Sequence, residues 1–166
     1  MRAGALLIAV LAVLAAAVPA QAAPPHHVFV IVLENEDAAT TFGPASPAPY
    51  LAQTLRSQGA FVPEYYGIGH NSLDNYLAMV SGQAPTSATQ GDCPVFTDVL
   101  PATPAPDGQV VGQGCVYPAQ VQTVADQLEA RGLTWKGYME DMGNDPVRDN
   151  GTTCAHPAIG TPDRTQ

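Results

Sequence analysis

The sequence predicts an α/β fold. Residues 27–33 form a continuous apolar run rich in β-branched side chains, which is typical of a strand buried on both faces of a parallel sheet. Helical patterns and further strand candidates then alternate along the chain, which favours helices packed on a sheet through right-handed connections. With 166 residues, the chain has room for about one domain.

The elements after the first strand follow in order. A helix is predicted over 49–59, where apolar residues recur at helical spacing and a glycine ends the pattern. Residues 61–66 come next as a short strand or extended segment, which Pro63 restricts to an edge or an irregular path. A second helix is predicted from Ser72 to Gly82, because its apolar residues match the i, i+3, i+4, i+7 template.

The second half of the chain is less regular. Residues 83–117 are rich in Pro and Gly without periodicity, so we expect a loop. A third helix is predicted from Val121 to Gly132, and residues 133–139 are the third strand candidate. Because three strands make a narrow sheet for this class, we expect a domain that continues past Gln166.

The first 22 residues have the pattern of a signal peptide. A basic residue precedes an apolar run, and the small-x-small site Ala20-Gln21-Ala22 follows. A membrane anchor is the alternative, but Pro19 interrupts a run that is already short for a span. We therefore expect a signal peptide over 1–22, a domain over 23–166, no stable membrane anchor, and a secreted or periplasmic protein.

Charge and cysteine content narrow the functional classes. Six basic and fifteen acidic side chains give a net charge of −9, which predicts no nucleic-acid-binding surface. In an oxidising compartment, Cys93 and Cys115 are expected to form a disulfide that closes a loop of about 20 residues. Cys154 is then left over, as a free thiol or with a partner outside this chain.

Ser72 is the first candidate for chemistry. It follows a glycine turn and opens a helix, so its hydroxyl is expected beside backbone N–H groups that favour an anion. The alternative is that Ser72 is only the N-cap of that helix. A serine nucleophile also needs a base or a metal to activate it, and His70, two residues away, is a doubtful base.

A second cluster follows the first predicted strand. Residues 34–37 are Glu-Asn-Glu-Asp, at the carboxyl end of a strand, where open α/β sheets bind ligands. Glu34 offers hard oxygen ligation to a divalent cation, and the amide of Asn35 could donate to a phosphoryl oxygen. Alternatively, these residues cap the next turn or face solvent.

Several segments together resemble the secreted bacterial phosphoesterase family that contains acid phosphatases and phospholipases C. That family belongs to the alkaline-phosphatase-like superfamily. The resemblance is carried by residues 27–35 (HVFVIVLEN), 69–82 (GHNSLDNYLAMVSG), 93–94 (CP), 114–118 (GCVYP), 136–142 (KGYMEDM) and 154–157 (CAHP).

The resemblance implies the N-terminal half of an alkaline-phosphatase-like three-layer sandwich that hydrolyses phosphate esters. It further implies that Glu34 is a metal ligand, that Ser72 is the metal-bound nucleophile that becomes phosphorylated, and that Asn35 and Asn75 hold phosphoryl oxygens. The cofactor would be a divalent metal ion, with Mg, Ca, Mn and Zn all open. Asp74 stands where similar sequences often have Pro, which leaves the preferred ester open.

The same resemblance limits what this chain can do alone. The family's other metal ligands come from the second half of the domain, beyond Gln166, so we expect the chain as given to be inactive. The alternative is a non-catalytic secreted domain that binds a phosphorylated or sulfated anion without turnover. A sulfatase-like esterase is a third possibility.

Overall fold

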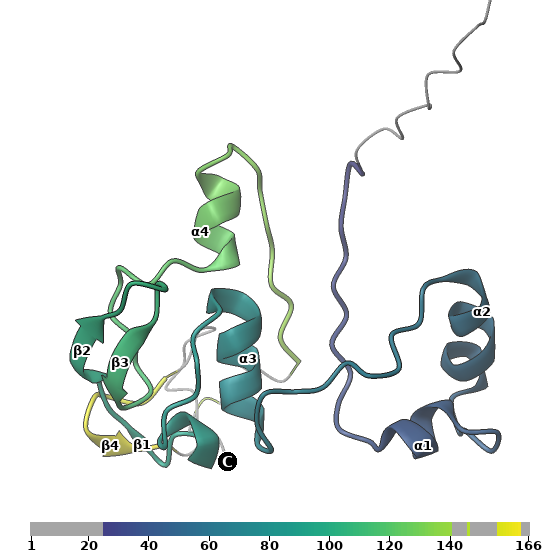
Figure 1. The fold of residues 1–166 in the computed structure, drawn as a ribbon, viewed down its shortest axis with the longest axis horizontal. Helices are drawn as coiled ribbons and strands as arrows, with labels where there is room; N and C mark the ends of the chain where they lie inside the picture. Colours follow the sequence, from purple (N-terminus) through teal and green to yellow (C-terminus); the bar gives the residue numbers. More distant parts are fainter. Residues whose placement is uncertain (1–24, 141–145, 147–155, 164–166) are drawn as a thin grey trace, which may run out of the picture. The chain divides into compact units, whose positions relative to one another are not determined.

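The computed structural model describes residues 25–140, 146 and 156–163, which form two compact units divided between Phe61 and Val62 (Figure 1). The predicted signal peptide over 1–22 and Cys154 lie outside the described residues. The elements are α1 (Ala38–Phe42), the π-helical η1 (Tyr50–Leu55), α2 (Arg56–Gln58), α3 (Ser72–Ser81), the 3₁₀ turn η2 (Thr89–Gly91), β1 (Val95–Phe96), β2 (Leu100–Pro104), β3 (Val110–Gln113), α4 (Val124–Glu129) and β4 (Thr161–Pro162).

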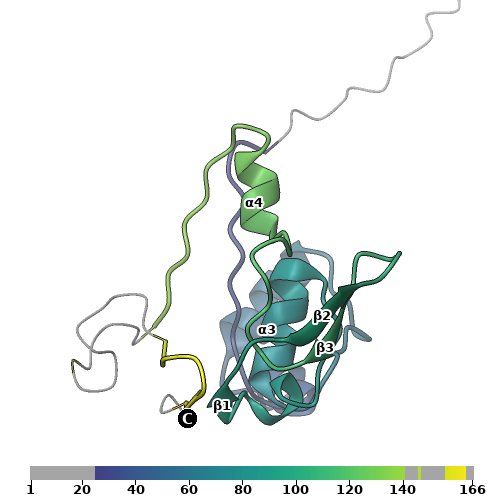
Figure 2. The same cartoon turned by 90° about the vertical axis from the view of Figure 1, so that its left-hand side faces the viewer.

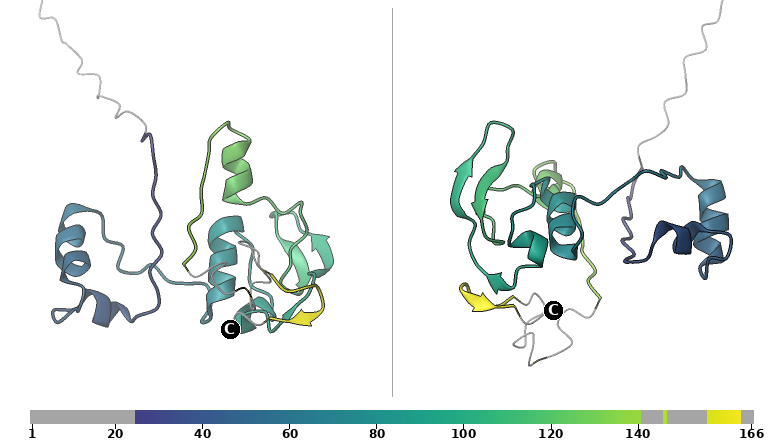
Figure 3. Two further views of the ribbon diagram at one scale, coloured as in Figure 1. Left: turned by 180° about the vertical axis from the view of Figure 1, so that it is seen from behind. Right: turned by 60° about the horizontal axis from the view of Figure 1, so that its bottom comes forward.

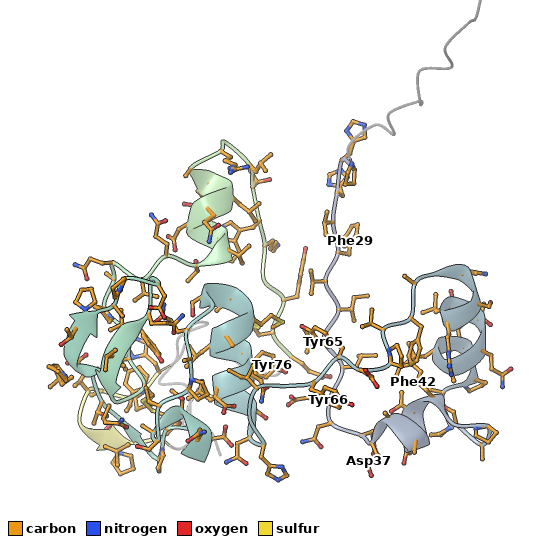
Figure 4. All side chains as sticks on the ribbon, viewed as in Figure 1. Phe29, Asp37, Phe42, Tyr65, Tyr66 and Tyr76 are labelled. Atoms are coloured by element: carbon orange, nitrogen blue, oxygen red, sulfur yellow. A yellow bond between two sulfur atoms is a disulfide. The ribbon has the colours of Figure 1, made fainter. Side chains whose placement is uncertain are left out.

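The first unit does not contain the strand predicted over 27–33. This segment is extended, and its apolar side chains are exposed, from 46% for Val32 to 86% for Phe29 (Figure 4). A buried strand needs neighbouring strands for its backbone groups and cover for its two faces. Among the described strands, none pairs with residues 27–33, so the expected buried strand is a wrong prediction for this structure.

The helix predicted over 49–59 is confirmed in position. It begins as the π-helical turn η1 and ends as α2, and Gly59 follows as the C-cap in an extended rather than left-handed conformation. Phe42, at the end of α1, packs edge-on against Phe61 with ring centroids 5.0 Å apart. The guanidinium of Arg56 lies 4.2 Å from the centroid of the Phe61 ring. Through Phe61, these contacts connect the end of α1 with α2.

The second unit is built around the region that the sequence analysis assigned to a loop. Residues 83–117 contain η2, β1, β2 and β3, together with most of the buried side chains of the unit, among them Cys93, Val99 and Cys115. Strands β2 and β3 form an antiparallel hairpin in which Pro104 pairs with Val110. The loop prediction is therefore wrong, because short strands containing proline hide the alternation by which strands are recognised.

A specific turn closes this hairpin. The N–H of Gly108 donates to the carbonyl of Ala105 at 3.1 Å, and the N–H of Ala105 donates to the carbonyl of Gln109 at 2.8 Å. Gly108 has a φ of 83°, in the left-handed region that glycine adopts without strain. Pro106 and Asp107 occupy the two central positions, where these residue types favour a type I turn.

The sheets of the described part are small and antiparallel. Besides the β2–β3 hairpin, β1 pairs with β4, with Val95 opposite Pro162. Residues 61–66 follow the irregular path that Pro63 left open, and the strand candidate over 133–139 is exposed and forms no strand. The mixed α/β content is confirmed, whereas the described strands form no parallel layer.

The two helices of this unit lie close to their predicted positions. Helix α3 runs from Ser72 to Ser81, and Gly82 ends it with a φ of 70°. Helix α4 begins after the N-cap Thr123 rather than at Val121. Helices α3 and α4 contact each other, and α4 lies above α3 in Figure 2 and in the left view of Figure 3. No helix in the described ranges is long and apolar enough to cross a membrane.

Two glutamine side chains join the hairpin to the end of α3. Gln83 donates to the carbonyl of Gly108 at 3.0 Å and accepts from the N–H of Val110 at 2.8 Å. Gln109 donates to the carbonyl of Gly82 at 3.0 Å and accepts from the N–H of Ala84 at 2.7 Å. Each amide therefore bonds through both its nitrogen and its oxygen, which satisfies backbone groups on both elements.

Candidate active site at the start of helix α3

Ser72 is the first residue of α3. The N-cap is Asn71, whose φ and ψ of −87° and 177° are those of extended backbone. The alternative that Ser72 is itself the cap is therefore wrong. The side-chain amide of Asn71 donates to the carbonyl of Gln90 at 2.6 Å instead of capping the helix. Ser72 is half-buried, at the end of the helix where the backbone dipole favours negative charge.

Asn75 ties the preceding glycine turn to the helix. Its Oδ1 accepts from the N–H of Ile68 at 2.8 Å, and its Nδ2 donates to the carbonyls of Gly69 at 3.1 Å and Asn71 at 2.6 Å. A Cβ on Gly67 would lie 2.6 Å from this Oδ1, which explains the glycine there. The amide predicted to hold a phosphoryl oxygen is thus engaged in holding the turn.

Asp74 is buried under the same turn, with 1% of its surface exposed. Its Oδ1 accepts from Nδ2 of Asn75 at 3.1 Å, whereas its Oδ2 has no hydrogen-bond partner among the described residues. A Cβ on Gly69 would lie 1.8 Å from that Oδ2. Gly69 therefore provides the space that the carboxylate occupies.

Asp92 also belongs to this region, although no sequence pattern predicts it. Its Oδ1 accepts a hydrogen bond of 2.8 Å from the backbone N–H of Leu73, a residue 19 positions earlier. This amide belongs to the first turn of α3, where backbone donors have no partner within the helix. No local pattern could have revealed the contact, because the two residues are far apart in the sequence.

A buried polar network and a disulfide stabilise the region around Asp92. Thr86 Oγ1 donates to the carbonyl of Gly114 at 2.6 Å, and Thr89 Oγ1 donates to the carbonyl of Thr86 at 3.1 Å. The predicted disulfide between Cys93 and Cys115 is confirmed, with Cα atoms 5.9 Å apart. Both threonines and both cysteines are buried. We refer to residues 86–93 with Gly114 and Cys115 as the disulfide platform.

Glu34 and Asn35 lie in the first unit, in the exposed segment before α1. Asp37 is the N-cap of that helix by position, and its carbonyl accepts from the N–H of Thr41 at 2.9 Å. The four predicted site residues thus fall into two groups, with Ser72 and Asn75 together on α3 in the second unit.

The predicted binding of a divalent cation requires a group of ligand side chains that lie close together. Within the described ranges, no group of three or more His, Cys, Asp or Glu side chains is placed to hold a metal ion. Divalent cations such as Ca²⁺ take six to eight oxygen ligands, and Mg²⁺ takes an octahedral set. The described residues therefore do not form a complete site for such an ion.

A cavity of about 670 Å³ lies at the other end of α3, where its lining includes Ser81, Gln109, Pro118 and Val121. All of its lining residues are uncharged, so the cavity lacks the cationic groups that would attract a phosphate. Nearby, the hydroxyl of Tyr117 donates to the carbonyl of Ala84 at 3.1 Å, and burial raises the pKa of Tyr117. The candidate anion site is therefore the start of α3 rather than this cavity.

Comparison with known proteins bears on the same region. Residues 45–159 match the model of the phosphoesterase family. A phosphatidylinositol-3-phosphatase from Mycobacterium tuberculosis (strain ATCC 25618 / H37Rv) is 29% identical over 116 residues, which are 70% of this chain and 31% of that protein. The chain thus spans about a third of the relative's length. No solved structure matches at a significant level. The family match includes Ser72, Asn75 and Asp92 but not Glu34 or Asn35.

Proposed function

The chain belongs to the phosphoesterase family, and we propose on that premise that it hydrolyses phosphate esters through a phosphoserine intermediate on Ser72. The observation that carries this proposal is the position of Ser72 as the first residue of the ten-residue helix α3. The positive end of the helix dipole favours the charge of a phosphoryl group there. The similarity to a phosphatidylinositol-3-phosphatase supports a phosphate ester as substrate.

The reaction takes place in two displacements. In the first, the Ser72 oxygen forms a bond to phosphorus, the bond from phosphorus to the ester oxygen breaks, and the hydroxyl proton leaves with the alcohol product. In the second, water attacks phosphorus, the bond to Ser72 breaks, and phosphate is released as the serine regains a proton. The start of α3 is proposed to stabilise the negative charge of the phosphoryl group in both steps.

A divalent cation is proposed as the cofactor, and it would supply the activation that a serine hydroxyl needs near neutral pH. Glu34 is proposed as one oxygen ligand and Ser72 as another. Asn35 is proposed to hold a phosphoryl oxygen. For Asn75, the hydrogen bonds to Gly69 and Asn71 favour a role in holding the turn.

Two wider expectations belong to the same proposal. An alkaline-phosphatase-like three-layer sandwich would give residues 27–33 the neighbours that a buried strand requires. Action outside the cytoplasm is supported by the Cys93–Cys115 disulfide, because disulfides persist in oxidising compartments.

Substitution of Ser72 tests the mechanism. In the protein made from its complete natural reading frame, Ser72→Ala should lower kcat for p-nitrophenyl phosphate by about three orders of magnitude or more, because the covalent route is lost. Ser81→Ala, at the other end of α3, is the matched control and should keep activity. Acid quenching of the unaltered enzyme with labelled substrate should leave phosphate on Ser72.

Four results would contradict the proposal. Turnover retained by Ser72→Ala would exclude the serine nucleophile. Phosphate binding without turnover in the unaltered protein would support the anion-binding alternative. Faster hydrolysis of p-nitrophenyl sulfate than of the phosphate would indicate a sulfatase-like enzyme. Turnover that persists in chelator would exclude the metal.

A further inference from the structure

The start of α3 is held by a segment that lies much later in the sequence. Two hydrogen bonds reach it: the amide of Asn71 donates to the carbonyl of Gln90 at 2.6 Å, and the N–H of Leu73 donates to Oδ1 of Asp92 at 2.8 Å. Both acceptors lie 19 residues beyond their donors. The helix start and the disulfide platform are therefore directly connected.

Asp92 is itself held firmly on this platform. Its N–H donates to the carbonyl of Thr89 at 3.2 Å, and the N–H of Cys93 donates to the carbonyl of Ala88 at 2.8 Å. Cys93 is then covalently bound to Cys115, and both cysteines are buried. The carboxylate of Asp92 thus projects from a segment that is fixed on both sides.

The backbone at this point has an uncommon conformation. Asp92 and Cys93 both have positive φ, 54° and 56°, which is rare for residues other than glycine. Such residues persist where the surrounding structure holds them, and they cluster at functional sites. In this conformation the Asp92 carboxylate reaches the amide of Leu73.

This amide is part of the peptide bond that joins Ser72 to Leu73. A hydrogen bond to it therefore restrains the backbone of the candidate nucleophile itself. We propose that Asp92 is a positioning residue, which holds Ser72 in the orientation that phosphoryl transfer requires; the inference rests on the proposed function. Catalysis is sensitive to such placement, because a displacement of about 1 Å at a reacting group can lower the rate about a hundredfold.

Two substitutions of Asp92 separate positioning from general stability. Asp92→Ala removes the acceptor, whereas Asp92→Asn keeps a carbonyl oxygen that can accept from Leu73. In the protein made from its complete natural reading frame, we expect Asp92→Ala to lower kcat about tenfold to a hundredfold, with KM within about twofold. Asp92→Asn should recover most of the loss.

Asp98 provides the matched control, because it is an exposed carboxylate of the same unit. Asp98→Ala and Asp98→Asn change charge in the same way and should leave kcat unchanged. Hydrogen exchange at the Leu73 amide, measured by NMR, should be faster in Asp92→Ala and near the unaltered rate in Asp92→Asn.

The outcomes distinguish this inference from the proposed function. Unchanged kcat in Asp92→Ala, or an equal loss of kcat in Asp92→Asn and Asp92→Ala, would overturn the positioning role while phosphate ester hydrolysis stands. If the unaltered protein hydrolyses no phosphate ester, the proposed function fails and the positioning role fails with it.

Discussion

The glycine turn before α3 depends on the absence of side chains at two positions. Gly67 and Gly69 face side chains of the helix that follows, so that Asn75 and Asp74 can approach the backbone of the turn closely. A Cβ at Gly69 would lie 1.8 Å from Oδ2 of Asp74 and 2.6 Å from its Cγ. Because Asp74 is buried, its carboxylate has little room to move away.

Gly69→Ala should therefore destabilise the protein. We expect a loss of about 1–3 kcal/mol in the free energy of unfolding, the usual range for overpacking a buried site. The measurement is urea denaturation. Gly91→Ala is the control, because a Cβ there would lie 3.8 Å from Pro94 Cδ, in ordinary van der Waals contact. In an Asp74→Ala background the effect of Gly69→Ala should shrink; an equal effect in both backgrounds would contradict the clash.

At this scale the start of α3 at Ser72 was predictable from the sequence, whereas the contact made by Asp92 was not. The helix start was recognisable because glycines precede Ser72 and a 3.6-residue period follows it, although Asn71 proved to be the cap. The role of Asp92 depends on a contact across 19 residues, and the chain around it has no distinguishing pattern. Contacts of this kind are set by tertiary structure rather than by local sequence.

Among the described helices, α4 is the one whose start is defined by a capping box. The N–H and hydroxyl of Thr123 both donate to Oδ2 of Asp126 at 2.7 Å, and the N–H of Asp126 donates to Oγ1 of Thr123 at 3.4 Å. The hydrogen bond from the Thr123 side chain, followed by those from backbone N–H groups, lowers the pKa of Asp126 from its ordinary 3.8. The charged carboxylate is therefore the form that the cap stabilises.

The sign of this shift predicts a pH dependence. Because the pKa of Asp126 is lower in the folded state, the charged carboxylate stabilises the folded protein fully above pH 3.8. This stabilisation is lost as the pH falls through the pKa of the folded state. A carboxyl-carbon NMR titration should show Asp126 titrating below 3.8. In Thr123→Ala the pKa should rise towards its ordinary value, while Thr123→Ser should keep it low. Identical titrations in all three proteins would exclude the capping box.

The helices were easier to predict than the strands. Helix α3 and helix α4 have periodic apolar residues and a glycine at or soon after the end, which are local signals. Strands depend on partners, so the apolar run over 27–33 is extended and exposed in this structure despite its strand-like composition. The β2–β3 hairpin was missed, although Pro106, Asp107 and Gly108 form a turn signal that could have indicated it.

For the molecule as a whole, the disulfide is the strongest link between distant parts of the second unit. The bridge joins cysteines 22 residues apart, and closing a loop of this size constrains the unfolded chain. Replacing both cysteines by serine should lower the free energy of unfolding by about 3 kcal/mol, measured by urea denaturation. A reducing agent should have the same effect on the unaltered protein and none on the double variant. If the urea midpoint of the unaltered protein did not change after verified reduction, the stabilising role of the disulfide would be contradicted.

Family membership was predictable from the sequence, because it rests on several motifs spread along the chain. The match over residues 45–159 confirms it. The full active site was not predictable to the same degree. Glu34 and Asn35 lie outside the matched stretch and in the first unit, so their roles depend on contacts that no local pattern describes.

The anchoring of α3 also has a consequence for how the protein matures. The helix is complete at Ser81, but Asp92 holds its start and Gln109 holds its end. During synthesis the N-terminal end of the chain emerges first, so helix α3 leaves the ribosome before either anchor exists. Helix α3 gains both anchors only once the chain through Gln109 has been made, which makes the candidate active site a late product of folding.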